Sequence, residues 1–86
     1  MEVSIELTMS PLQDDFESHI IDFIKALRDS EFEVLENPLS TQIYGEYGKL
    51  MPFLTQAIEN SISKQKSVLI YMKMVKSNRA DYKPHF

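Results

Sequence analysis

The chain is predicted to fold as an α+β sandwich, in which two helices cover one face of a four-stranded antiparallel sheet. Three observations support this prediction: four short segments with strand-like patterns, two segments with a helical apolar stripe, and their order along the chain, β-α-β-β-α-β. A chain with this order buries its apolar faces most simply as a split βαβ, or ferredoxin-like, sandwich. In that topology the spatial order of the strands is 4-1-3-2.

The first half of the chain is expected to form a strand, a helix and a second strand. Residues 3–9 alternate between apolar and polar side chains, which is the period of a half-buried strand. The segment from about Asp14 to Asp29 has the helical period, with one apolar stripe made of Phe16, Ile20, Phe23, Ile24 and Leu27. Residues 32–36 form the second short strand, which ends before Asn37-Pro38 because this pair breaks regular structure.

The second half is expected to form a strand, a helix and a strand. The third strand runs from near Leu39 to Gly48, and the second helix runs from about Lys49 to Lys64. The apolar stripe of this helix consists of Leu50, Phe53, Leu54, Ala57, Ile58 and Ile62. Residues 67–75 form the fourth strand. Residues 1–76 are therefore expected to form one ferredoxin-like domain, followed by a polar tail at 77–86.

Composition argues against several classes of function. The 86 residues carry a formal net charge of −4, so they lack the basic surface that binds nucleic acid. The chain has no cysteine, which excludes disulfides, thiolate nucleophiles and cysteine-based zinc sites. An acylphosphatase-type enzyme on this fold would need an arginine in the first loop, and residues 9–13 contain none. No metal site and no enzymatic activity are predicted.

The sequence also bears on where the protein acts. The longest apolar-rich run, residues 67–75, is too short to span a membrane. The N-terminus does not show a basic segment followed by an apolar run, so no signal peptide is expected. We therefore expect a cytoplasmic protein that is not inserted in a membrane.

Two polar segments far apart in the sequence are predicted to meet at one end of the sheet. The topology places the end of the first strand beside the start of the third, so residues 9–13 should lie near residues 40–42. The stretches "SPLQDDF" (10–16) and "LSTQIYGEY" (39–47) resemble the two signature segments of the YkoF-like family, whose members bind thiamine and hydroxymethylpyrimidine. The matching positions are Pro11, Leu12, Asp14, Asp15, Ser40, Thr41 and Gly45.

The resemblance implies a non-catalytic protein that binds thiamine or its hydroxymethylpyrimidine moiety, in vitamin B1 salvage or transport. The residue types at the two segments suit a flat aminopyrimidine, because hydroxyl and amide groups can both donate to and accept from its edge. An acidic side chain can accept from the exocyclic amine, a tyrosine ring can contact a thiazolium cation, and glycine allows close approach or a bulge. The predicted ligand-binding residues are Met9, Ser10, Asp14, Asp15, Leu39, Ser40, Thr41, Gln42 and Tyr44.

Simpler roles exist for some of these residues. Ser40 and Thr41 follow Asn37-Pro38 and can serve only to satisfy turn groups, and Asp14 and Asp15 can serve only the helix dipole. The alternative function is a ligand-independent oligomeric module for regulation or assembly.

The sheet face away from the helices is predicted to be an assembly surface. It should carry Tyr44 and Tyr71 among aliphatic and charged residues, with Lys73 able to offset Glu6 or Glu46. Mixed, tyrosine-rich surfaces are common in interfaces, and a chain this short gains stability from added burial. The resembling family forms dimers and tetramers through its sheets. We therefore expect a homodimer or homotetramer with Tyr44 and Tyr71 at or near the contact.

Overall fold

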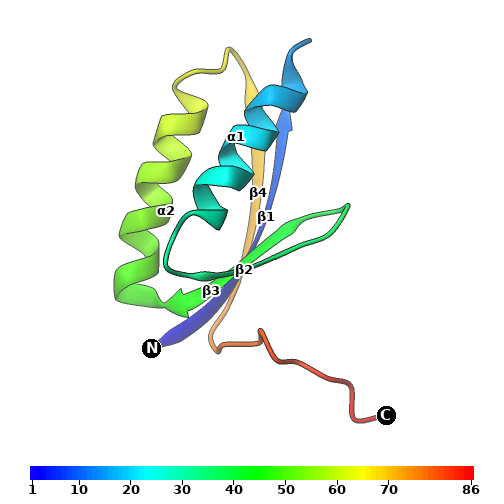
Figure 1. Cartoon of the computed structure of the whole chain (residues 1–86), viewed down its shortest axis with the longest axis vertical. Coiled ribbons are helices and arrows are strands. Elements are labelled where there is room, and N and C mark those ends of the chain that lie inside the picture. Colours follow the sequence, from blue (N-terminus) through cyan, green and yellow to red (C-terminus); the bar gives the residue numbers. More distant parts are fainter.

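The computed structural model describes residues 1–86 and contains four strands and two helices in the predicted order (Figure 1). The elements are β1 (Glu2–Pro11), α1 (Phe16–Arg28), β2 (Glu33–Glu36), β3 (Thr41–Glu46), α2 (Tyr47–Ile62) and β4 (Val68–Val75). All neighbouring strands pair antiparallel, in the order β2-β3-β1-β4. Both helices lie on the same side of the sheet (Figure 1). The predicted ferredoxin-like α+β fold and its strand order are confirmed.

One apolar core lies between the helices and the sheet. The alternating residues of β1 point into it, since Val3, Ile5 and Leu7 are at most 2% exposed. The core cluster consists of Val3, Ile5, Leu7, Phe23, Leu27, Ile43, Leu50, Leu54 and Ala57. The helical stripes predicted for α1 and α2 therefore face the sheet, except at their ends, where Phe16 and Ile62 are 52% and 39% exposed.

The other face of the sheet, which we call the open face, has no helix over it (Figure 1). It carries the polar residues of β1, and the ion pair predicted for Lys73 forms with Glu6 at 3.2 Å. Exposed apolar side chains on this face include Leu69, Tyr71 and Val75 of β4. The open face is therefore mixed in character, as the alternation in the sequence predicted.

The predicted boundary between the third strand and the second helix is wrong by two residues. Helix α2 begins at Tyr47, and Gly48 lies in its first turn instead of ending the strand. The N-cap is Glu46, whose carboxylate accepts a hydrogen bond from the Lys49 backbone N–H at 3.0 Å. A β-carbon on Gly48 would lie 3.1 Å from this carboxylate, so glycine leaves room for the cap.

Gly45 does not form the bulge that the sequence suggested as one possibility. It pairs with Val3 in a register that continues without interruption from Glu46 to Thr41. A β-carbon at position 45 would lie only 2.7 Å from Cδ1 of Phe32. Phe32 in turn packs against Phe53 of α2, with ring centroids 5.5 Å apart. The glycine is needed because an aromatic ring occupies the space over the strand.

The chain ends beyond β4 without further helix or strand. The first residues of this C-terminal tail contact β1 on the open face. The Ser4 hydroxyl donates to the Ser77 carbonyl at 2.7 Å and accepts from the Arg79 backbone N–H at 2.8 Å. Tyr82 and Phe86 are 60% and 96% exposed. Neither helix combines the length and hydrophobicity needed to cross a lipid bilayer.

Candidate functional site

The turn between β2 and β3 is held by Asn37. Its side-chain oxygen accepts hydrogen bonds from the backbone N–H groups of Leu39 at 2.8 Å and Ser40 at 3.0 Å. Asparagine commonly closes turns in this way. Because Asn37 satisfies these backbone groups, the hydroxyls of Ser40 and Thr41 are available for other contacts.

A cavity of about 170 Å³ lies where this turn meets the end of β1 and one side of α1. We call it the Thr41 cavity. It is lined by residues 7–9 of β1, by Ile20, Phe23 and Ile24 of α1, and by residues 37–41. None of these eleven side chains is charged. Leu39 is 84% exposed, so an apolar side chain stands at the rim of the cavity. The two polar segments therefore meet only in part: Met9 lies beside residues 39–41, whereas residues 10–13 do not line the cavity and contact β4 and the loop before it.

Thr41 is the one polar residue among the buried residues of the chain, with an exposure of 7%. Its hydroxyl makes no hydrogen bond within the protein, and its oxygen is not enclosed, because Gln65 Oε1 is the one enclosed side-chain polar atom without a partner. The hydroxyl therefore opens on the cavity that the residue lines. There it can hydrogen-bond to water or to a polar atom of a bound molecule.

Ser40, just before β3, and Gln42 and Tyr44 of β3 point to the open face. The Ser40 hydroxyl donates to Glu6 Oε2 at 3.0 Å, and Gln42 Nε2 donates to the Ser40 hydroxyl at 2.7 Å. The hydrogen bond from Ser40, followed by that from Lys73, lowers the pKa of Glu6. Tyr44 follows on the same face. Gln42 and Tyr44 thus lie on the opposite side of the sheet from the Thr41 cavity.

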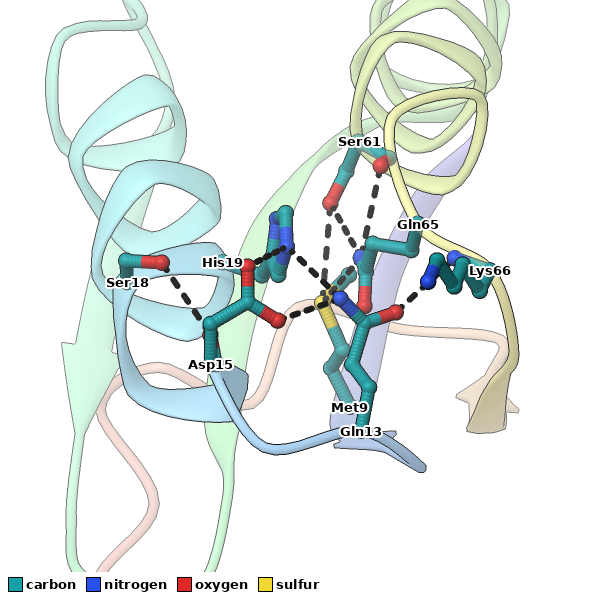
Figure 2. A network of polar contacts seen from close by, with 8 residues as sticks. All are labelled: Met9, Gln13, Asp15, Ser18, His19, Ser61, Gln65 and Lys66. Carbon is teal, nitrogen blue, oxygen red and sulfur yellow. Dashed lines mark hydrogen bonds and ion pairs between the residues drawn. The ribbon is translucent and has the colours of Figure 1, made fainter.

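Asp15 lies neither in the Thr41 cavity nor on the open face but in a polar network at the start of α1 (Figure 2). The Gln13 side chain lies at its centre and donates through Nε2 to Asp15 Oδ1. The same nitrogen lies 3.2 Å from His19 Nε2, while Gln13 Oε1 accepts from the Lys66 backbone N–H at 2.8 Å. The hydrogen bond from Gln13 lowers the pKa of the Asp15 carboxyl. The network joins the loop after β1 to the loop before β4.

A second part of this network supports the Thr41 cavity. The sulfur of Met9, which lines the cavity, accepts from the Ser61 hydroxyl and from Gln65 Nε2, both at 3.6 Å (Figure 2). Gln65 also donates to the Ser61 hydroxyl at 3.1 Å. The last turn of α2 and the loop after it therefore hold in place a side chain that forms part of the cavity wall.

The structure distributes the nine predicted ligand-binding residues over several places. Met9, Leu39, Ser40 and Thr41 line the Thr41 cavity. Gln42 and Tyr44 border a hollow on the open face. Asp14 and Asp15 border a third hollow with Gln13 and Lys66. Ser10 pairs with Leu69 of β4 and lines none of these. The acidic pair is therefore not brought to the cavity that contains Thr41.

Several residues of the cavity and its support were not among the predicted ones. Ile20, Phe23 and Ile24 of α1 form one wall of the cavity, whereas the helical period predicts only that they belong to the apolar stripe. Ser61 and Gln65 have no local pattern that marks them, because their partner, Met9, is more than fifty positions away. A helical stripe indicates which side chains face the sheet but not which of them border an empty space.

Comparisons with known proteins point to one family. The family model described as thiamine-binding protein matches residues 5–85. Among solved structures, protein SP2199 from Streptococcus pneumoniae is similar, with 28% identity, a TM-score of 0.83 and coverage of 91% of this chain and 89% of that chain. No curated protein matches the chain.

Two further solved structures share the fold. TM0486 from Thermotoga maritima, whose suggested role is thiamine biosynthesis or salvage, has 14% identity and a TM-score of 0.80, with coverage of 90% of this chain and 85% of that chain. MJ1052 from Methanocaldococcus jannascii has 15% identity and a TM-score of 0.75, with coverage of 90% and 81%. Because the family model spans nearly the whole chain, the protein belongs to the thiamine-binding protein family.

Proposed function

We propose that the protein binds the aminopyrimidine half of a thiamine-type molecule in the Thr41 cavity, without transforming it, and so serves vitamin B1 salvage or transport. The observation that carries the proposal is the hydroxyl of Thr41, a residue that is 7% exposed in the cavity wall: the hydroxyl makes no hydrogen bond within the protein and opens on the cavity. Membership of the thiamine-binding family and the similarity to TM0486 support a ligand of this class.

The walls suit the chemistry of an uncharged ring. Apolar side chains from β1 and α1 can contact the two faces of a pyrimidine, while the Thr41 hydroxyl can donate to a ring nitrogen or accept from the exocyclic amine. The cavity of about 170 Å³ is smaller than the roughly 300–1,000 Å³ of sites that enclose drug-sized ligands. The cavity therefore has room for the pyrimidine ring alone, and the thiazolium half of the ligand remains at the rim beside Leu39.

The absence of charge in the cavity predicts the preferred form of the ligand. No lysine or arginine lines the Thr41 cavity, so nothing there would neutralise a pyrophosphate. We expect hydroxymethylpyrimidine and thiamine to bind more tightly than thiamine pyrophosphate. Titration calorimetry with the three compounds measures this order, and a tighter pyrophosphate would contradict the assignment of the cavity.

Thermal unfolding tests binding itself. A ligand at 100 times its dissociation constant stabilises the folded state by about 2.7 kcal/mol, which raises the Tm of a domain this small by roughly 10–20 °C. Ile20→Phe places a larger side chain in the cavity wall and should abolish this shift. Ile62→Phe, a similar change at the exposed end of α2, should leave it intact. Equal shifts in both variants would place the ligand elsewhere.

We further propose that the protein forms a homodimer or homotetramer through its open face and acts in the cytoplasm. The mixed open face with its exposed Leu69, Tyr71 and Val75 supports assembly. If the oligomer forms while none of the three compounds changes the Tm, the ligand-independent assembly module becomes the better description.

A further inference from the structure

The side-chain oxygen of Gln65, in the loop after α2, is enclosed by the protein and accepts no hydrogen bond. The amide cannot turn over to give this oxygen a partner, because its Nε2 donates to the Ser61 carbonyl at 3.3 Å and a carbonyl only accepts. Buried polar groups in proteins are nearly always hydrogen-bonded. An enclosed acceptor without a partner therefore calls for a donor from outside the chain.

Gln65 lies behind one wall of the Thr41 cavity. Its Nε2 contacts the sulfur of Met9 at 3.6 Å (Figure 2), and Met9 lines the cavity. Gln65 itself lines none of the cavities of the protein. A donor can therefore reach Gln65 Oε1 only if a neighbouring side chain moves, and Met9 is the neighbour that borders the cavity.

The side chain of Met9 is suited to such a movement. Methionine is unbranched and adapts to irregular spaces, and its sulfur is a weak acceptor, here of two bonds of 3.6 Å from Ser61 and Gln65. Leu7 pairs with Thr41, and Met9 follows two residues later on the same face of the sheet. If Met9 turns aside, the space beside Thr41 extends to Gln65 Oε1.

We propose that Gln65 determines the specificity of the Thr41 cavity for an aminopyrimidine. The Met9 side chain turns aside, Gln65 Oε1 accepts a hydrogen bond from the exocyclic amine, and the Thr41 hydroxyl donates to a ring nitrogen. This inference rests on the proposed function and assigns the two polar groups of the ligand to two different residues. It predicts selection for the amine, because a ring without it leaves the enclosed oxygen unpaired.

Two compounds test the inference by titration calorimetry: hydroxymethylpyrimidine and the same ring with hydrogen in place of the amine. In the wild type the amine should raise the affinity roughly 5- to 50-fold. Gln65→Leu removes the acceptor and should lower this ratio to less than about twofold. Thr41→Val should weaken both compounds and leave the ratio unchanged. Gln56→Leu, the same substitution at an exposed position of α2, should leave both affinities unchanged.

A measurement on the wild type does not depend on the folding of any variant. In carbon–proton NMR, the Met9 methyl signal should shift with hydroxymethylpyrimidine and much less with the ring that lacks the amine. If the two compounds bind the wild type equally, or if Gln65→Leu keeps the ratio, the inference is overturned while the proposed function stands. If neither compound binds the wild type, both are overturned.

Discussion

Replacing Thr41 with valine should change stability and ligand binding in opposite directions. Valine keeps the shape of threonine and exchanges the hydroxyl for a methyl group. Thr41 is 7% exposed and its hydroxyl has no partner in the free protein, so the protein loses no hydrogen bond. The oxygen opens on the cavity and is not enclosed, so the variant recovers only a part of the roughly 1–3 kcal/mol that a fully buried unpaired hydroxyl costs.

The expected gain in the free energy of unfolding is about 0.5–1 kcal/mol, since the hydroxyl borders a cavity and is not fully enclosed. For a domain of this size that corresponds to a Tm increase of about 2–8 °C. Ligand binding should weaken by about 1–3 kcal/mol, or roughly 5- to 150-fold, because a polar atom of the buried ring is left unpaired.

Thermal unfolding without ligand and titration calorimetry with hydroxymethylpyrimidine measure the two effects. Thr55→Val, at an exposed position of α2, is the matched control and should change neither quantity appreciably. A Thr41→Val variant that loses stability would show that the hydroxyl has a partner in the free protein. A variant that binds the pyrimidine as tightly as the wild type would remove Thr41 from the site.

Three further predictions follow from the fold. Gly45→Ala should destabilise the protein by about 1–3 kcal/mol in chemical denaturation, because the added carbon overlaps the Phe32 ring, and Phe32→Leu in the same chain should recover part of the loss. The Gly48 backbone N–H, together with the N-terminal amino group, lowers the pKa of Glu46. This carboxylate therefore adds stability that is present above its ordinary pKa of 4.5 and is lost as the pH falls through the lower folded value, so Glu46→Gln should flatten the acid limb of the stability profile. Light scattering should give a mass well above the 10.0 kDa of one chain, and Tyr71→Asp should reduce it; a wild-type mass near 10.0 kDa would reject assembly, and an unchanged oligomer in the variant would reject this face.

The boundary errors have identifiable causes. Glutamate is not among the residues that most often cap helices, so Glu46 gave no signal for the start of α2 at Tyr47. Gly45 suggested a bulge because a glycine within a strand often marks one. Glycine is needed at this position because the ring of Phe32, from the segment between α1 and β2, lies over β3.

The sequence by itself determined the fold, because hydrophobic periods of two and 3.6 residues are local properties and the order of the elements leaves few topologies. It also predicted that residues 9–13 lie near residues 40–42, since antiparallel pairing places the end of β1 beside the start of β3; of the first segment, only Met9 does so. Only the tertiary structure decided which of the predicted polar residues share a site. Whether the Thr41 hydroxyl opens on a cavity depends on how α1 packs over β3, and the Ser40 hydroxyl turns to the open face because it donates to Glu6. Those contacts join positions more than fifteen residues apart, and no local pattern in the sequence records them.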